Sequence, residues 1–584
     1  MDIAGRTSVR ESIIRTLGLL LFLLAAALPG CSQSSPPTAA ESSTHSIDQL
    51  SARIKRFYTE QRWGEIAREV TSPSANDADI DYYYGSALAQ LGRLDDARDA
   101  FLAGRRISPR DKRFPIELGG VAFKQRQYPN AAAWLRQALR LDPNDAYAND
   151  FLGTVYFLED NLDAALKYWN RIAKPQIDTV RPDHSLRIRP ALIDRALAFS
   201  PASELRLADL ETSRARVAGL GIFPTARVQL AARPDGKFDV ALSLQERNRW
   251  GSNVWEALLS AFSGVAYQTL YPAYFNIDGS AINVTSLVRW DAQKRRLDAG
   301  LSGPLHENPK WRYRLGADLR NENWDLRDSF AGPAPVLASL NLRREAGSVE
   351  IESFDSGRWG WSAGAEFSHR DYRRVAPGAT LTPELLLTGP QLKQIAAIHC
   401  DWLRLPDRRL TIETSASSQL ARIWSEPAHA FSKLQGGILA HWFPKAEGDD
   451  YEMQSRIRAG ATAGQPPFDE LYMLGMERDN NLWMRAHVGT RDGRKGSAPL
   501  GRRYFLSNSE IDKNVYGNGL ITLKLGPFLD SGRTTDPALN LGSPKWLWDT
   551  GAQAKLRVLG VGVTFVYGKD LRTGNNAFYF AARP

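Results

Sequence analysis

Apolar and polar residues alternate along much of the C-terminal half of the chain, from about residue 281 onward. In the clearest segment, Trp311, Tyr313 and Leu315 alternate with Arg312 and Arg314. Because successive side chains of a β-strand point to opposite faces, this period of two predicts strands with one apolar and one charged face. The same alternation recurs in residues 282–290, 359–367, 453–463 and 561–567.

Strands with one apolar and one charged face fit either a soluble β domain or a barrel that spans a membrane. Tryptophan and tyrosine stand at the ends of several segments, as in the interfacial girdles of an outer-membrane barrel, and the charged residues then line a wet lumen. At roughly 20 residues per strand and turn, residues 251–584 predict an antiparallel transmembrane β-barrel of about 16 strands.

A repeat of 34 residues precedes this region, with four columns of similar residues in register. This period is typical of tetratricopeptide repeats, in which small residues let two helices approach, a larger side chain packs between them and proline ends the second helix. We therefore predict an α-solenoid over residues 47–175, with 47–72 as a degenerate capping pair of helices. Its concave face is expected to bind a peptide, or else the repeats are a spacer without a ligand. The repeat-packing residues are Gly85, Gly119 and Gly153; Ala97, Ala131 and Ala165; Phe101, Leu135 and Trp169; and Pro109 and Pro143.

The N-terminus has the order of a secretory signal, because Arg6, Arg10 and Arg15 precede an apolar run that is too short to span a bilayer. The run ends in Leu-Pro-Gly-Cys31, which resembles a bacterial lipoprotein box and implies acylation of Cys31, although the proline is unusual there. The alternative is ordinary cleavage near residues 39–40. Residues 1–30 are thus predicted to be a lipoprotein-type signal peptide, and the Ser/Pro/Thr-rich residues 31–46 a flexible tether.

Residues 176–250 predict a small α/β domain. Leu207, Leu210 and Val217 have helical spacing, and a hairpin with an Asp-Gly turn at Asp235-Gly236 follows. The order of these elements resembles the second half of a polypeptide-transport-associated (POTRA) domain, whose exposed sheet edge is thought to receive extended polypeptide. An ordinary α/β linker domain is the alternative.

Composition limits the chemistry that the chain can perform. The 584 residues carry a net charge of +9, which does not require a nucleic-acid partner, and only two cysteines, which exclude a disulfide framework. The eight histidines lack the HExxH spacing, and no phosphate-binding loop is present. Gly360-Trp361-Ser362-Ala363-Gly364 matches the GxSxG spacing, but it lies within an alternating segment predicted as a strand and not at the strand-to-helix turn of a nucleophile elbow. We therefore expect no cofactor and no enzymatic activity, and we interpret His369, His399 and His487 as lumen or girdle residues.

Two motifs relate the barrel to a family. Met484-Arg485-Ala486-His487 follows a long polar connection, and Phe528-Leu529-Asp530-Ser531-Gly532 lies further on. Together they resemble the bacterial surface-antigen barrel superfamily, which includes outer-membrane protein insertases and two-partner secretion pores. The resemblance implies that a loop folds into the lumen and that Arg485 at its tip pairs with Asp530. Ala486 departs from the family's glycine, and the alternative is that the two residues are lumen charges that never meet.

The sequence thus predicts a multidomain outer-membrane lipoprotein: tetratricopeptide repeats and a POTRA-like domain in the periplasm, and a barrel in the membrane. By resemblance, we expect it to move or insert polypeptide across or into the outer membrane, with the repeats capturing a client or a periplasmic partner. Its other expected partner is outer-membrane lipid. The alternatives are a non-transporting anchor that displays the repeats as a docking scaffold, and an outer-membrane hydrolase.

Overall fold

The computed structural model describes residues 40–583, apart from residues 75, 183, 248–267, 328–334, 377–380, 446–449, 478, 518–520, 537–542, 544 and 559–560. The predicted signal peptide and Cys31 lie outside the described residues. The chain consists of two units, residues 1–109 and 110–584. Among the described residues, no helix combines the length and the apolar character that crossing a bilayer needs.

The first unit is helical. Helix α1 begins at Ala40, so the predicted tether is wrong for residues 40–46. The physical reason is that no glycine or proline lies between residues 40 and 59, so a helix that buries Ile54 extends upstream without interruption. The helices of this unit are α1 (Ala40–Thr59), α2 (Trp63–Glu69), α3 (Ala78–Gln90) and α4 (Leu94–Ile107).

Helices α3 and α4 show why the repeat columns exist. A Cβ added to Gly85 on α3 would lie 2.7 Å from Cε1 of Phe101 on α4, so only glycine leaves room for the ring. Ala97 and Phe101 are fully buried, and Pro109 follows the end of α4.

The second unit begins with two further helix pairs of the same design. Leu135 lies over Gly119, and Trp169 lies over Gly153, so neither glycine has space for a side chain. Ala131 and Ala165 are buried, and Pro143 follows the end of α6. These helices are α5 (Arg113–Lys124), α6 (Tyr128–Leu141), α7 (Ala146–Leu158) and α8 (Leu162–Trp169).

The α/β domain contains a three-stranded sheet of order β1-β3-β2, in which β1 runs parallel and β2 antiparallel to β3. The helix and the hairpin lie where the pattern predicts them, whereas β1 and α9 were not predicted. The core includes Leu210, Val217, Val240 and Leu242. The elements are β1 (Ile177–Pro182), α9 (Pro190–Ala196), α10 (Leu207–Gly219), β2 (Thr225–Ala232) and β3 (Phe238–Gln245).

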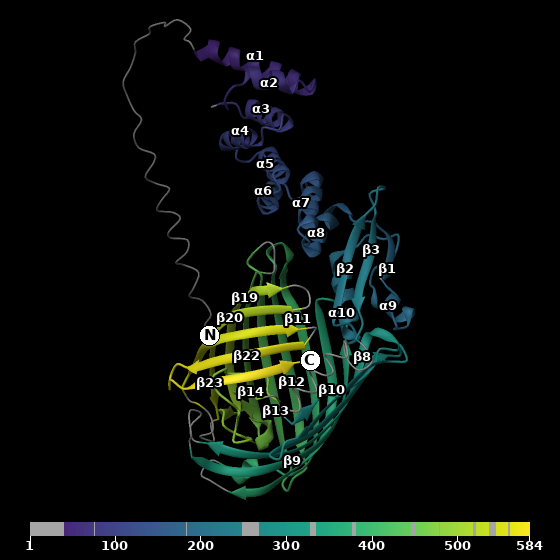
Figure 1. Cartoon of the computed structure of the whole chain (residues 1–584), viewed down its shortest axis with the longest axis vertical. Helices are drawn as coiled ribbons and strands as arrows, with labels where there is room; N and C mark the ends of the chain where they lie inside the picture. Colours follow the sequence, from purple (N-terminus) through teal and green to yellow (C-terminus); the bar gives the residue numbers. More distant parts are fainter. Residues whose placement is uncertain are drawn as a thin grey trace, which may run out of the picture. The chain divides into compact units, whose positions relative to one another are not determined.

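A large, curved antiparallel sheet forms the rest of the unit (Figure 1). In the described residues it has eighteen strand segments, of which β4, β16 and β17 have two residues each. The fifteen longer strands are close to the expected number of about 16, and the predicted barrel architecture is confirmed. They are β5 (Ala273–Ile277), β6 (Ile282–Trp290), β7 (Lys294–Leu305), β8 (Asn308–Arg327), β9 (Val336–Ser353), β10 (Trp359–Ala376), β11 (Gly389–Leu405), β12 (Leu410–Ile423), β13 (His429–Trp442), β14 (Tyr451–Gly464), β19 (Arg503–Gly517), β20 (Ile521–Thr535), β21 (Leu547–Val558), β22 (Val561–Asp570) and β23 (Asn576–Arg583).

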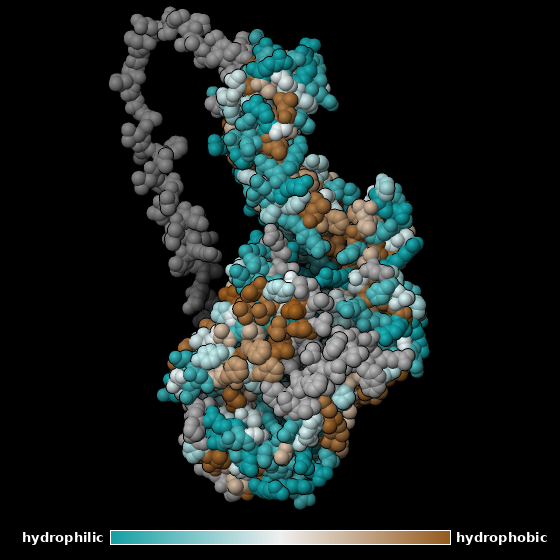
Figure 2. All heavy atoms as spheres, viewed as in Figure 1, coloured by the Kyte–Doolittle hydropathy of each residue, from teal (hydrophilic) through white to brown (hydrophobic). Residues whose placement is uncertain are grey.

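The two faces of this sheet differ in the way that the alternation predicts. On β13, Leu434 is 64% exposed whereas its neighbour Lys433 is buried, and on β10 Phe367 is exposed whereas Arg370 is fully buried. Figure 2 shows hydrophobic residues gathered on the outer face of the strands. The apolar side chains therefore face outward and the charged ones face the interior, the reverse of a soluble protein.

One end of the barrel is attached to the α/β domain. Glu211 on α10 pairs with Arg404 at 2.8 Å, and Arg216 donates to the carbonyl oxygens of Phe354 and Asp355 in the turn between β9 and β10. Glu211 is buried, so this contact fixes α10 against the turns that join neighbouring strands. The other end of the barrel carries the long connection between β14 and β19.

We predict that Asp81 in α3 makes the first repeat sensitive to pH. Burial raises the pKa of the Asp81 carboxyl to about 6, above the roughly 3.9 expected in the unfolded chain. The fold favours the protonated form, so the stabilisation that Asp81 gives at low pH is lost as the pH rises from about 4 through about 6. Hydrogen exchange of α3 in the full chain, corrected for intrinsic rates, should show opening on the order of tenfold more frequent at pH 7.5 than at pH 5.

Asp81→Asn is the matched variant, because the amide oxygen can still accept from the backbone N–H of Ser74. It should remove most of the pH dependence and reduce opening at pH 7.5. An unchanged pH dependence in this variant would show that another group is responsible.

Candidate functional site

Residues 465–502, here called the lumen segment, connect two strands that pair directly with each other. Strands β14 and β19 are in register from Tyr451↔Lys513 to Ala461↔Arg503, so the segment leaves and re-enters the sheet at neighbouring positions. Most of its side chains are buried, and Leu474 and Met484 are fully so. It contains a short 3-10 helix, Phe468–Glu470, and the strand fragments β15 (Tyr472–Met473), β16 (Thr490–Arg491), β17 (Arg494–Lys495) and β18 (Leu500–Gly501).

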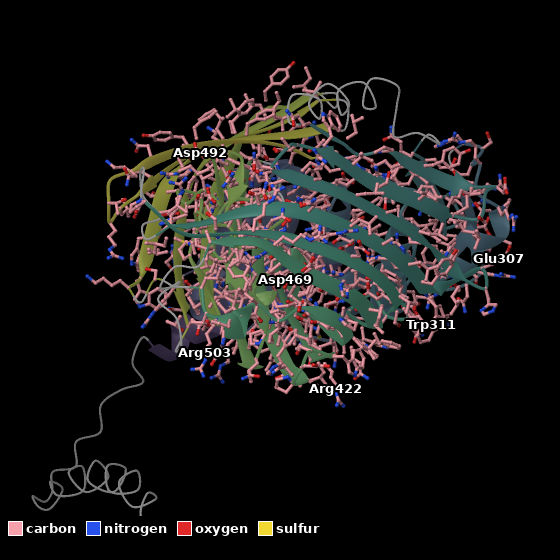
Figure 3. The ribbon with its side chains drawn as sticks, turned by 90° about the horizontal axis from the view of Figure 1, so that it is seen from below. Glu307, Trp311, Arg422, Asp469, Asp492 and Arg503 are labelled. Atoms are coloured by element: carbon pink, nitrogen blue, oxygen red, sulfur yellow. The ribbon has the colours of Figure 1, made fainter. Side chains whose placement is uncertain are left out.

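The segment folds into the barrel rather than over it. Figure 3 shows Asp469 of this segment among the side chains within the sheet, whereas Arg422 and Arg503 lie at its edge. Lys495 pairs in parallel with Trp324 on β8, and a Cβ on Gly568 of β22 would collide with the backbone of Arg485. The segment therefore contacts the interior wall at strands far apart in the sequence.

Arg485 and Asp530 meet inside the lumen. Nη2 of Arg485 donates to Oδ1 of Asp530 at 2.6 Å, Nε donates to Oδ2 at 2.9 Å, and the backbone N–H of Arg485 donates to Oδ2 at 3.0 Å. This is a two-pronged guanidinium–carboxylate pair with a third bond from the backbone, so it fixes both the side chain and the turn that carries it. The Asp530 side chain has no exposed surface.

Further contacts complete this first anchor. The guanidinium of Arg485 lies 3.9 Å from the centroid of the Phe528 ring, and its Nη1 donates to Glu510 and Gln553. Asn508 donates to Oδ1 of Asp530 at 2.8 Å. Two carboxylates therefore surround one guanidinium, and aromatic and amide groups exclude water from it.

Ala486 occupies the position where the family motif has glycine, and the structure accommodates it. Ala486 does not have a positive φ, so the turn does not need glycine. Its backbone N–H donates to Oδ2 of Asp549 at 2.7 Å, and Nδ1 of His487 lies 3.1 Å from the same oxygen. The tip of the segment is thus held by β20 and β21 together.

A second anchor lies against the first strands of the barrel. Asp479 of the lumen segment pairs with Arg289 on β6 at 2.9 Å and with Arg296 on β7 at 2.8 Å. Lys495 pairs with Asp479 at 3.0 Å and with Glu322 on β8 at 2.6 Å. All these charges are buried or nearly so, and each has a partner of opposite sign.

A third anchor uses the two carboxylates of the 3-10 helix. Asp469 pairs with Arg370 on β10 at 3.1 Å and accepts a hydrogen bond from the hydroxyl of Tyr372. Glu470 accepts from Nζ of Lys393 on β11 at 2.5 Å, and Lys433 on β13 donates to its backbone oxygen at 2.8 Å. A polar cavity of about 420 Å³ lies beside these groups.

The charges of the wall are unevenly distributed. Its β9–β13 part presents mainly cations, with Glu366 among them, and its β19–β22 part presents mainly carboxylates, with Lys555 among them. The cations are Arg344, Arg370, Lys393 and Lys433, and the carboxylates are Glu510, Asp512, Asp530, Asp549 and Asp570. The lumen segment carries acidic groups toward the first part and basic groups toward the second. Because each group of the segment meets a wall charge of opposite sign, the segment is held in one orientation.

Sequence reasoning named Arg485 and Asp530 but missed the second and third anchors. Asp469 and Glu470 stand in an otherwise apolar stretch, Pro467–Gly475, which was a usable signal that two carboxylates enter a closed interior. Nothing in the sequence paired Asp479 with Arg289, because strand parity gives the face of a residue and not its neighbour across the lumen.

Comparison with known proteins gives the following likenesses. The tetratricopeptide repeat family matches residues 64–112 and 116–179, whereas no curated protein matches the chain. Similar solved structures include BamA from Haemophilus ducreyi lacking POTRA domains 1-3 (11% identity, 70% of this chain and 83% of that chain covered, TM-score 0.41). Another is CdiB from Escherichia coli (12% identity, 70% of this chain and 76% of that chain covered, TM-score 0.45). A third is CdiB from Acinetobacter baumannii (10% identity, 70% of this chain and 73% of that chain covered, TM-score 0.40). The predicted tetratricopeptide repeats are confirmed by the family match.

We predict that Arg485→Gln and Asp530→Asn each loosen the lumen segment. Each leaves one buried charge without its main partner, which costs about 3 kcal/mol. Because the two residues act as a pair, the double variant should cost less than the sum of the single variants, with a coupling of roughly 1–3 kcal/mol. Hydrogen exchange or limited proteolysis of residues 465–502 in the folded protein measures the opening.

Asp371→Asn is the control, because Asp371 pairs with Arg373 at the surface of β10. It should leave the segment unchanged. Strict additivity of the Arg485 and Asp530 substitutions would show that the two groups do not stabilise the segment together.

Proposed function

We propose that the protein is an outer-membrane barrel that moves polypeptide across or into the membrane, and that its lumen segment is the gate. The observation that carries this proposal is the barrel's reversed polarity, with apolar side chains outside and paired charges inside around a segment of its own chain. An apolar exterior of this size is stable only in lipid, and a charged interior only with water or counter-charges.

The aromatic residues support a bilayer position. Trp359, Trp402 and Trp442 are exposed near the end that meets the α/β domain, and Trp424 and Trp548 are exposed near the opposite end. Such rings prefer the two interfaces between lipid and water. Acylation of Cys31, which lies outside the described residues, would add a lipid anchor on the side of the repeats, in the periplasm.

The soluble domains support a polypeptide as the cargo. Strand β2 forms one edge of the order β1-β3-β2, and most of its residues are exposed or half-buried. An extended chain can add to such an edge through backbone hydrogen bonds, which do not depend on its sequence. The repeats would capture the client or a partner first, and α10 connects this domain to the barrel's turns.

The three anchors support a gate. All are ionic, so water or a charged client can replace their partners, whereas an apolar plug could not be exchanged in this way. Movement of the lumen segment away from one part of the wall would open a polar path beside it.

The second candidate function is a sealed anchor that displays the repeats as a docking scaffold. The filled lumen favours it, since the described segment contacts the wall on β6–β13 and on β19–β22.

Electrical recording in planar bilayers separates the two functions. The native protein should conduct weakly, and the Arg485→Gln variant and a variant lacking residues 467–500 should conduct clearly more, because the segment no longer fills the lumen. An unfolded polypeptide added on the side of the α/β domain should block this current.

Asp371→Asn is again the matched control and should conduct as the native protein does. A barrel that stays sealed both intact and without its lumen segment would support the anchor and rule out a transport pore.

A further inference from the structure

Three buried side chains converge where the tip of the lumen segment reaches the wall. They are His487 of the segment, Asp549 on β21 and Asp570 at the end of β22. One ligand-type atom from each lies within 4.8 Å of the other two. The cluster adjoins the Arg485–Asp530 pair and shares Asp549 with the contacts that hold the tip, but the proposed transport function does not require it.

The charges of this cluster do not balance. Among the described residues, neither Asp549 nor Asp570 pairs with a lysine or an arginine, and both side chains are at most 3% exposed. Arg485 is close by in sequence, but its guanidinium is occupied by Asp530 and Glu510. Buried carboxylates without a counter-charge are costly, so the site needs a cation.

The hydrogen bonds give His487 a defined orientation. Nδ1 lies 3.1 Å from Oδ2 of Asp549, and Nε2 lies 3.9 Å from Oδ2 of Asp570. The 3.1 Å between Nδ1 and Oδ2 of Asp549 is about the spacing of two ligands of one tetrahedral ion. In the metal-bound form Nδ1 would give up its proton and ligate the ion beside Asp549.

One oxygen at the site has no partner. Oδ1 of Asp549 is buried and accepts no hydrogen bond, although Oδ2 of the same carboxylate accepts the N–H of Ala486. This buried oxygen is therefore available to accept a ligand. Asp570 is held in place by the backbone N–H of Arg572 and the hydroxyl of Thr573, so it is positioned before any ion binds.

We propose that His487, Asp549 and Asp570 bind one divalent transition-metal ion, with Zn²⁺ as the best match. One imidazole nitrogen and two carboxylate oxygens form a mixed donor set that Zn²⁺ accepts at about 2.0–2.2 Å, with water in the remaining position. Ligands of a tetrahedral ion stand roughly 3.3 Å apart, so binding draws the three side chains together by about 1 Å. The ion would fasten the tip of the lumen segment to β21 and β22.

The test is a calorimetric titration with Zn²⁺. The full-length protein in detergent is first stripped of metal with a chelator. We expect one equivalent to bind with micromolar or tighter affinity at pH 7.5. His487→Gln and Asp570→Asn should each weaken binding about tenfold or more. Cobalt(II) in place of zinc gives a visible absorption band that reports the same site without any transport assay.

His369→Gln is the matched control, because His369 is exposed on the outer face of β10, and it should bind zinc as the native protein does. Asp570→Asn keeps one oxygen acceptor for the backbone N–H of Arg572, and its amide N–H can donate to the hydroxyl of Thr573. Heat-modifiable gel mobility checks that each variant is folded. The proposal is overturned if the native protein binds no zinc, or if binding survives both substitutions. A failed transport function would leave this titration unaffected.

Discussion

In the membrane-spanning barrel that we propose, backbone hydrogen bonding in hydrocarbon is the constraint on which the rest of the structure depends. A strand in lipid cannot leave its N–H and C=O groups unpaired, so the chain must form ladders with neighbours along its whole length. The continuous registers from β6 to β14 and from β14 through β19 to β23 meet this demand in the described residues. Once the ladders exist, the period of two places Leu434 on the outer face and Lys433 in the interior.

The charged side chains that face the interior also need partners, because a buried charge without a counter-charge is costly. The lumen segment supplies them: Asp469 and Glu470 meet cations on β10, β11 and β13, whereas Arg485 meets carboxylates on β19 and β20. A wall with mainly cations on one part and mainly carboxylates on the other holds a segment of complementary charge in one orientation. The same pairs are exchangeable, so a buried segment of this kind can be both stable and movable.

Much of the fold was predictable because it follows from local rules. The repeat columns reflect direct contact, since Phe101 and Trp169 occupy the space that a side chain on Gly85 or Gly153 would need. The barrel strands follow from parity alone. Strand β1 was missed because its six residues carry little alternation, and the start of α1 was misplaced because a Ser-rich composition does not prevent a helix without proline or glycine.

The site was less predictable, and the reason is geometric. Arg485 and Asp530 could be named because their two motifs together resemble a pair in a known barrel superfamily. The contacts of Asp479, Lys495 and Glu470 join residues up to 190 positions apart across a lumen, and no sequence period encodes such neighbours. Asp549 and Asp570 read as ordinary lumen charges until the fold brings them to His487.

The most direct test of the barrel's reversed polarity compares two adjacent residues of β13 in a bilayer. Spin labels are placed singly at Leu434 and Gln435 in a chain whose Cys31 and Cys400 are replaced by alanine, and their contact with oxygen, which collects in lipid, and with a water-soluble nickel complex is measured. The label at 434 should contact oxygen and be shielded from the nickel complex. The label at 435 should contact oxygen less and the nickel complex more. Equal access of the nickel complex to both positions would contradict the barrel described above.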